Sequence, residues 1–181
     1  MDARHWLGQA ERADAAIYAA VARTDNPKLD RAMYLVSDAA NYSRLWIAAA
    51  GLLAAAGGRN GRRAAVHGVA SIAVTATVVN AAVKPLARRR RPDRGPLLPR
   101  HVQMPRSRSF PSGHAASAFA FATGVAAIQP QAAGALRALA ALVAYSRVHT
   151  GVHYPGDVVF GSLLGISVAQ LTTRAVERSR F

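Results

Sequence analysis

The chain has 181 residues and no cysteine, with 51% hydrophobic residues and a formal net charge of +14. The missing cysteines exclude disulfides and thiolate metal sites. An apolar yet strongly basic chain of this length suits either one membrane domain with basic loops or a protein that binds an anionic partner.

The N-terminal segment, Met1 to Arg23, predicts an amphipathic helix rather than a signal peptide, because acidic residues interrupt its apolar positions. Such a helix can lie on a membrane surface or pack on a soluble core. Asp25-Asn26-Pro27 ends it and starts a second helix, since proline fits the first helical turn. We expect residues 1–40 to form interfacial helices. The apolar positions of the first helix are Trp6, Leu7, Ala10, Ala13, Ile17 and Val21.

Apolar stretches with few charges follow, and they predict an all-α membrane bundle of about five transmembrane helices. We expect one domain over residues 1–181, with its transmembrane core at residues 41–173. Because the stretches are rich in alanine, a soluble helical bundle is the alternative. The stretches are Leu45–Gly57, Ala64–Val83, His114–Ile128, Ala132–Tyr145 and Val158–Thr172.

Alternation of five spans predicts which loops share a side of the bundle. The loop Lys84–Pro111, expected to be the active-site loop (residues 84–111), and the loop Val148–Pro155 emerge on one side. A basic turn at Gly58–Arg63, the turn Gln129–Gln131 and the C-terminus emerge on the other. Loops as long as the first are commonly functional or disordered. The alternation therefore gathers three polar stretches of the sequence at one face.

The first polar stretch, KPLARRRRP, begins at Lys84, one of only two lysines in the chain. Its cations could simply contact anionic lipid headgroups. The same residue types suit a phosphate site, because an ammonium is a point charge and a guanidinium is a bidentate fork.

The second stretch, PSGH, directly precedes an apolar helix. Ser112 is placed as its N-cap. The start of a helix also offers backbone N–H groups to an anion, and Gly113 allows a ligand to approach the backbone closely. His114 in the first turn is either a structural histidine or a proton donor to a bound ligand.

The third stretch, SRVHTGVHYPGD, places His149, His153 and Asp157 four residues apart, as in a metal site on one helical face. Glycine and proline within the stretch interrupt the helix that would align them. The alternative is a nucleophilic dyad in which neutral His153 attacks and Asp157 accepts a hydrogen bond from its other ring nitrogen. Arg147 would add a second fork for a phosphate.

Together the three stretches predict phosphoryl transfer through a phosphohistidine. Cations and backbone donors would stabilise the charge on the transferring group, one histidine would attack, and the other would protonate the leaving oxygen. We expect no metal and no cofactor, because the positive charge is built into the protein.

The three motifs resemble those of the type-2 phosphatidic acid phosphatase superfamily in type, order and spacing. They are Lys84 with Arg91-Pro92 after six intervening residues, Pro111 to His114, and Ser146-Arg147 with His153 and Asp157.

This resemblance implies roles for individual residues. His153 would be the nucleophile, oriented by Asp157, and His114 the general acid. His149 would be structural, and Arg88, Arg89 and Arg90 would remain candidates for headgroup contact. The residues implied to hold the phosphate are Lys84, Arg91, Ser112, Gly113 and Arg147.

The resemblance also implies a multi-pass phosphatase of the cell membrane whose partners are the lipid bilayer and a lipid phosphate, with no nucleic acid. The small chain, rich in arginine and alanine, is similar to actinobacterial members proposed to act on decaprenylphosphoryl-5-phosphoribose in cell-wall arabinan synthesis. A polyprenyl diphosphate, phosphatidate or phosphatidylglycerol phosphate is the alternative substrate. A soluble phosphatase or haloperoxidase and a non-enzymatic basic membrane protein are the competing classes. The numbers of basic residues at the two ends of the bundle are nearly equal, so the positive-inside rule does not fix the orientation. The surface-type first helix leads us to expect a cytoplasmic N-terminus and active site.

Overall fold

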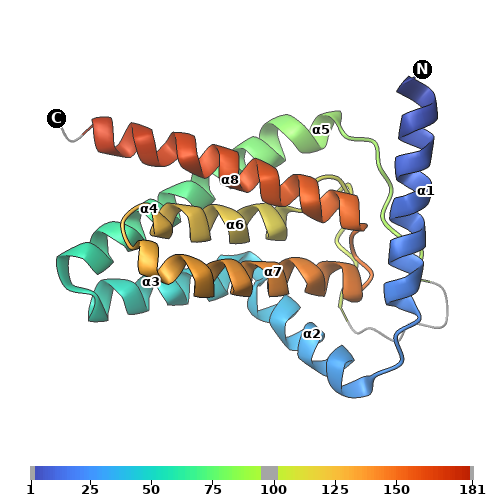
Figure 1. Cartoon of the computed structure of the whole chain (residues 1–181), viewed down its shortest axis with the longest axis horizontal. Coiled ribbons are helices and arrows are strands. Elements are labelled where there is room, and N and C mark those ends of the chain that lie inside the picture. Colours follow the sequence, from blue (N-terminus) through green and yellow to red (C-terminus); the bar gives the residue numbers. More distant parts are fainter. Residues whose placement is uncertain (1–2, 95–101, 180–181) are drawn as a thin grey trace.

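The core of the protein is a bundle of five long helices, seen side-on in Figure 1. The computed structural model describes residues 3–94 and 102–179, and no strand occurs within these ranges. Helix α6 lies at the centre and packs against α4, α7 and α8. The five helices are α3 (Arg44–Ala56), α4 (Gly58–Thr77), α6 (Gly113–Ala126), α7 (Ala133–His149) and α8 (Pro155–Arg178).

Helix α6 can occupy the centre because most of its side chains are small. Its neighbour α8 approaches the α6 backbone at Gly165, where a Cβ would collide with the carbonyl oxygen of Ala116. Small residues at helix interfaces permit such close approach of backbones. Larger side chains fill the far side of the core, where the rings of Trp46 and Phe121 lie 5.3 Å apart. The fully buried alanines of α6 are Ala115, Ala116, Ala118, Ala120 and Ala122.

The second predicted span is longer than expected. Helix α4 continues through a π-helical segment, η2 (Val78–Val83), into α5 (Lys84–Leu86). The predicted basic turn at Gly58–Arg63 is wrong, because these residues form the first turns of α4. The chain reverses at Gly57 and Gly58 instead. Gly58 adopts a left-handed φ of +57°, which glycine tolerates. Because this one residue completes the reversal, Arg59, Arg62 and Arg63 can all lie within the helix.

The other predicted spans correspond to helices α3, α6, α7 and α8, with small differences at their ends. Helix α7 runs on to His149, so Arg147 lies in its last turn. Among the described residues, two helical runs are long and apolar enough to cross a membrane alone, Gly58–Leu86 and Pro155–Arg178. The count of five spans therefore stays a prediction.

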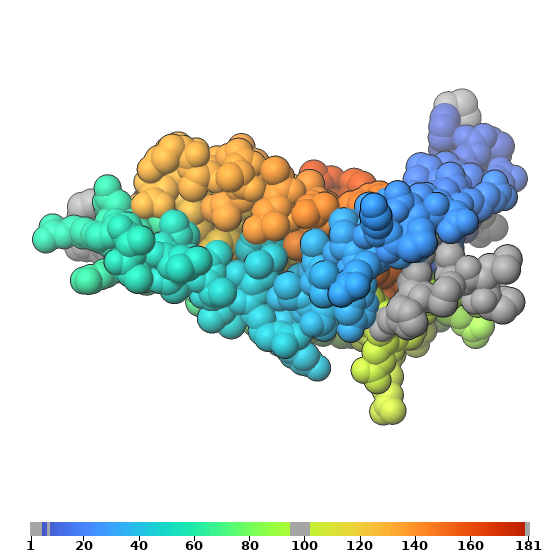
Figure 2. Space-filling view, turned by 90° about the horizontal axis from the view of Figure 1, so that it is seen from below, coloured from blue at the N-terminus to red at the C-terminus, as the bar shows by residue number. Residues whose placement is uncertain are grey.

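Two helices precede the bundle. Helix α1 (Ala3–Ala22) stands across the end of the bundle at which α7 ends and α8 begins. Helix α2 (Pro27–Ala39) packs along α7, on the face shown in Figure 2. The amide oxygen of Asn26 caps α2, accepting the Leu29 N–H at 3.1 Å. A short 3₁₀ turn, η1 (Asn41–Ser43), then joins α2 to α3.

The predicted apolar stripe of α1 packs on the bundle at Val21, which contacts the buried cluster around Tyr18, but not along its exposed members. Trp6 and Ile17 are each 54% exposed, whereas Asp14 and Tyr18, on a different face of the helix, are buried. Helix α1 therefore docks through a carboxylate, a phenol and Val21, while Trp6, Ala10, Ala13 and Ile17 of the predicted stripe are exposed.

Candidate active site

The three polar stretches meet at the end of the bundle that α1 crosses. His114 comes from the start of α6, Arg147 from the last turn of α7, and Asp157 from the first turn of α8. His153 lies in the turn between α7 and α8, and Arg91 lies in the extended segment after α5. The alternating direction of the helices thus places these residues together, as the sequence predicts.

The turn between α7 and α8 separates the two histidines of the third motif. Helix α7 ends at His149, and Gly151 then adopts a left-handed φ of +71°. The backbone carbonyl of Arg147 accepts the N–H groups of Val152 and His153 at 3.1 and 3.2 Å, which closes the turn. His149 instead faces α2, where its Nε2 lies 2.6 Å from Oδ1 of Asp30. The alternative of one metal site shared by both histidines is therefore not supported by this geometry.

The carboxylate of Asp157 is fully buried and faces His153. Oδ2 lies 3.5 Å from Nδ1 of His153, longer than the roughly 2.7–3.2 Å of an N–H···O hydrogen bond. Oδ2 instead accepts the hydroxyl of Ser109 at 2.5 Å and the Tyr154 N–H at 3.0 Å. The predicted hydrogen bond between His153 and Asp157 is thus not formed at this separation, although the two groups face each other. Catalytic hydrogen bonds are often long before substrate binds.

The other nitrogen of His153 is directed towards a cation. Its Nε2 lies 3.2 Å from Nη1 of Arg91, and a guanidinium can only donate. Nε2 must therefore be the unprotonated nitrogen, and Nδ1, facing Asp157, carries the hydrogen. Burial lowers the pKa of His153 to about 4, with Arg91 and Arg147 adding to the shift and Asp157 opposing it. His153 is consequently a neutral imidazole with a lone pair on Nε2, as a nucleophile requires.

Arg91 and Lys84 meet at a serine that the sequence analysis did not single out. Arg91 donates from Nε to the carbonyl of Ser107 at 2.9 Å and from Nη2 to its hydroxyl at 3.2 Å. The ammonium of Lys84 donates to the same hydroxyl at 3.3 Å. A Cβ on Gly113 would lie 3.9 Å from that ammonium, so both cations adjoin the start of α6. This arrangement offers two positive charges to an anion at the helix N-terminus.

Arg147 is almost fully buried, with only 1% of its surface exposed. Its Nη1 donates to the hydroxyl of Ser37 on α2, while its Nε has no hydrogen-bond partner within residues 3–94 and 102–179. A buried guanidinium with an unused N–H is costly unless an anion binds to it. The geometry therefore fits the predicted role of Arg147 as a fork for a phosphate.

Ser112 and Gly113 begin α6, but they do not contribute equally. The hydroxyl of Ser112 accepts the Ala115 N–H at 3.5 Å, as expected for an N-cap. The Ser112 N–H, however, donates to the backbone carbonyl of Asp157 at 2.9 Å. The N–H groups of Gly113 and His114 are therefore the candidates for contact with an anion, rather than that of Ser112.

His114 faces an asparagine from outside the three motifs. Its Nε2 lies 3.0 Å from Oδ1 of Asn41 in η1. The Asn41 amide donates from Nδ2 to Oδ1 of Asp38 at 3.1 Å, which fixes the direction of the amide. Because an amide oxygen only accepts, Nε2 of His114 must carry a hydrogen. Nε2 thus carries a hydrogen in His114, whereas Nε2 of His153 carries a lone pair.

A cavity of about 250 Å³ opens beside His114, between η1 and the end of α4. Tyr42 at its edge is 89% exposed, and both Tyr42 and Ser43 have left-handed backbone angles, at φ 53° and 59°. Such angles are strained for residues other than glycine and concentrate at functional sites. The lining combines polar and apolar side chains: Ser43, Trp46, Val79, Asn80, Lys84 and Ser117.

Arg89 also belongs to the site, which corrects its grouping with Arg88 and Arg90. Its guanidinium lies 2.9 Å from Oδ1 of Asp157 and 2.5 Å from Oδ2 of Asp14, while Arg88 and Arg90 are exposed. Burial opposes the charged form, but the hydrogen bond to Asp14 and the charge of Asp157 hold the pKa of Arg89 above its ordinary value. The signal for this was available in part, because side chains alternate in an extended segment, so Arg89 shares its side with Arg91.

The chain is similar to known proteins over most of its length. The family model of the PAP2 superfamily matches residues 64–181. Decaprenylphosphoryl-5-phosphoribose phosphatase from Mycobacterium tuberculosis is 33% identical over 167 residues, with 90% of each chain covered. The protein of the same name from Mycolicibacterium smegmatis is 36% identical, over 86% of this chain and 84% of that one.

Two solved structures share the fold. The transmembrane PAP2-type phosphatidylglycerolphosphate phosphatase from Bacillus subtilis has a TM-score of 0.71 at 25% identity, covering 94% of this chain and 87% of the other. Aquifex aeolicus LpxE has a TM-score of 0.69 at 25% identity, covering 88% of this chain and 94% of the other.

Proposed function

The chain belongs to the PAP2 superfamily of phosphoric monoester hydrolases, and from that premise we propose that it removes the terminal phosphate of a polyprenyl-linked lipid. The substrate that we favour is decaprenylphosphoryl-5-phosphoribose, because relatives named as phosphatases of this lipid match nearly the whole chain. The single observation that carries the mechanism is that Nε2 faces a donor in His153 and an acceptor in His114, so the first presents a lone pair and the second a hydrogen.

The first half of the reaction would form a phosphohistidine. The phosphate would lie among Lys84, Arg91 and Arg147 at the start of α6. The lone pair on Nε2 of His153 would attack phosphorus, and the bond from phosphorus to the ester oxygen would break. The incoming phosphate anion would favour a second proton on His114. The resulting imidazolium would give its Nε2 proton to that oxygen and become neutral, so the lipid leaves as a neutral alcohol.

The second half would regenerate the enzyme. Water would attack phosphorus, the bond to Nε2 of His153 would break, and the water's proton would pass to His114. Asp157 would stabilise the positive charge on the phosphorylated ring through Nδ1–H, once the present 3.5 Å separation tightens. No step in this scheme requires a group beyond the chain's own residues and water.

The cavity beside His114 supports a substrate whose leaving group is a sugar. It adjoins the proton donor, so it would hold the part of the lipid that leaves. Asn80, Ser43 and Ser117 could bond to ribose hydroxyl groups, and Trp46 and Val79 could contact their carbon faces. A glycerol-based lipid is the second candidate, since a phosphatidylglycerolphosphate phosphatase shares the fold.

The membrane arrangement that we propose has five spans, with α1 lying on the cytoplasmic surface next to the active site. The exposed apolar stripe of α1, with Trp6 and Ile17, suits an interfacial helix. Because the chain has no cysteine, Arg90→Cys would give a single label site beside the catalytic centre. We expect no reaction with an impermeant maleimide in intact cells and full reaction after lysis. Labelling in intact cells would place the site on the outer face.

The experiment that tests the function measures phosphate release by the detergent-purified protein in excess EDTA, for wild type and His153→Ala. The substrates would be a polyprenyl phosphoribose phosphate, a polyprenyl diphosphate, phosphatidate and phosphatidylglycerol phosphate. Release from the first substrate at the highest kcat/KM, by wild type only, is the expected result. Faster turnover of a glycerol-based lipid would overturn the substrate, and equal release by His153→Ala would overturn the mechanism.

A further inference from the structure

Arg89 joins two carboxylates that come from opposite ends of the chain. Nη1 donates to Oδ1 of Asp157 at 2.9 Å, and Nη2 donates to Oδ2 of Asp14 on α1 at 2.5 Å. The guanidinium lies over the ring of Tyr154, 4.2 Å from its centroid. Three separate contacts thus hold one side chain, which belongs to the six intervening residues of the first motif and not to its defining positions.

The carboxylate of Asp157 depends on this arginine for one of its two oxygens. Oδ2 is held by the hydroxyl of Ser109 and the N–H of Tyr154, whereas Oδ1 accepts from Arg89. A fully buried carboxylate needs a charged partner, and the imidazole of His153 is neutral in the resting state. Arg89 therefore balances the charge of Asp157 and fixes the rotation of its carboxylate towards His153.

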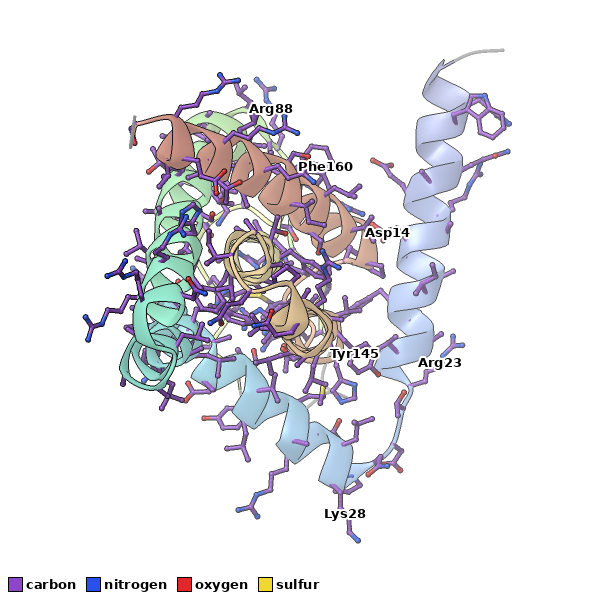
Figure 3. All side chains as sticks on the ribbon, turned by 60° about the vertical axis from the view of Figure 1, so that its left-hand side comes forward. Asp14, Arg23, Lys28, Arg88, Tyr145 and Phe160 are labelled. Atoms are coloured by element: carbon purple, nitrogen blue, oxygen red, sulfur yellow. The ribbon has the colours of Figure 1, made fainter. Side chains whose placement is uncertain are left out.

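Asp14 holds the arginine from the other side and also contacts the first turn of α8. Its Oδ1 accepts the N–H of Gly156 at 2.7 Å, next to Asp157 in the chain. A Cβ at Gly156 would lie 2.9 Å from Oδ2 of Asp14, so glycine is what permits this approach. Figure 3 shows Asp14 on the side of α1 that faces the bundle. Helix α1 is thus anchored at the residue before the catalytic carboxylate.

We propose that Arg89 is a positioning residue for the nucleophile, which fixes Asp157 and, through Asp14, makes the docked helix α1 part of the catalytic apparatus. The proposal rests on the proposed function, because it takes His153 as the nucleophile. It goes beyond that function in assigning a catalytic dependence to a helix that precedes all three motifs. In this proposal Arg89 orients Asp157 and His153, whereas Lys84, Arg91 and Arg147 bind the phosphate.

The experiment measures kcat, KM and inhibition by inorganic phosphate for the full-length protein in detergent, on the four lipids above. Arg89→Met is compared with Arg90→Met, which removes the same charge from an exposed neighbour. Asp14→Asn is compared with Glu11→Gln, which removes an exposed carboxylate from the same helix. The Arg89→Met/Asp14→Asn double variant and His153→Ala complete the set.

We expect Arg89→Met to lower kcat by about 10–100-fold, the usual size of an effect on residues that orient an active group. KM and the inhibition constant for phosphate should stay within about twofold, because Arg89 does not touch the phosphate. Asp14→Asn should lower kcat less, and the double variant should be no worse than Arg89→Met alone, because Asp14 acts through Arg89. Arg89→Lys should restore part of kcat, since a point charge reaches one carboxylate but cannot bridge two.

Several outcomes would overturn the proposal. Wild-type kcat in Arg89→Met, a loss carried by KM instead of kcat, or additive losses in the double variant would each do so. If Arg89→Met fails to fold, the comparison of Asp14→Asn with Glu11→Gln tests the proposal instead. Equal kcat for these two variants would show that Asp14 does not affect catalysis and would refute the proposal. The proposed function fails separately, through inactive wild type on every lipid or an active His153→Ala.

Discussion

The side of the site that holds His153, our proposed nucleophile, and the side that holds His114, our proposed proton donor to the leaving group, differ in how tightly they are packed. His153 is 2% exposed and lies against Asp157, whose carboxylate accepts three hydrogen bonds from Arg89, Ser109 and Tyr154. His114 has Asn41 on one side and opens onto a cavity on the other. The first side must hold one geometry for every phosphate, whereas the second must admit a particular lipid. The buried, hydrogen-bonded side around His153 therefore suits the chemical step, and the cavity beside His114 suits the selection of the substrate.

The largest effect should come from the nucleophile side. His153→Ala should abolish turnover on every phosphate ester, with a loss of at least about 1,000-fold in kcat, because no other group can form the covalent intermediate. Rapid-quench trapping should find no phosphorylated protein in this variant, while acid-labile phosphoprotein should form in wild type. His149→Ala is the matched control, since His149 faces Asp30 on α2. A similar loss of trapping in His149→Ala would contradict the separation of the two histidines.

The loss of activity on removing His114 should depend on the leaving group of the substrate. His114→Ala should lower kcat/KM on a lipid phosphate by about 100–10,000-fold, the usual contribution of general acid–base catalysis. On nitrophenyl phosphate the loss should be far smaller, because that leaving group departs without a proton. Steady-state kinetics of both substrates for the same preparation check this. Equal losses on the two would remove His114 from the role of general acid.

The cavity should discriminate between lipids rather than set the overall rate. Asn80→Ala should lower kcat/KM for a polyprenyl phosphoribose phosphate by about 2- to 10-fold, since one hydrogen bond to the sugar contributes roughly 0.5–1.5 kcal/mol. Turnover of nitrophenyl phosphate should not change, because it has no sugar to contact. Competition assays with the two substrates measure the ratio directly. An equal loss on both would show that Asn80 acts on the shared phosphate site.

The smallest effect should be that of mild acid on the nucleophile. Since the pKa of His153 is lowered to about 4, the imidazole stays neutral as the pH falls from 7 to 5, and only about a tenth is protonated at pH 5. The unfolded chain takes up this proton near its ordinary pKa of 6.5, so the contribution of His153 to stability is lost as the pH falls from about 6.5 to 4. Imidazole ¹⁵N shifts, assigned by difference from His153→Ala, should titrate near pH 4. A midpoint near 6.5 would contradict the lowering of the pKa of His153 by burial.

The nucleophile side was predicted from sequence better than the leaving-group side. His153, Asp157 and Arg147 lie within one short stretch, and the glycine and proline that shape its turn are local signals. The partner of His114 is Asn41, which lies 73 residues earlier and belongs to no motif. Nothing in the local pattern of either residue indicates that pairing.

One local error and one partial signal show the limits of pattern reading. The basic turn predicted at Gly58–Arg63 is helical, because a single left-handed glycine completes the reversal and arginine is a good helix former. The alternation of side chains in an extended segment separates Arg89 from Arg88 and Arg90, which are exposed. This alternation does not reveal that Arg89 also donates a hydrogen bond to Asp14 on α1.

The sequence by itself determined the helical bundle, the three motifs, and their meeting at one end. These features follow from apolar spacing, from turn residues, and from the alternation of helices, all of which are properties of neighbouring residues. The tertiary structure alone decided what residues 3–43 contribute: Asp14 to Arg89, Ser37 to Arg147, and Asn41 to His114. Each of these contacts joins residues more than 70 positions apart, so it depends on how the helices pack and on no local preference of the chain.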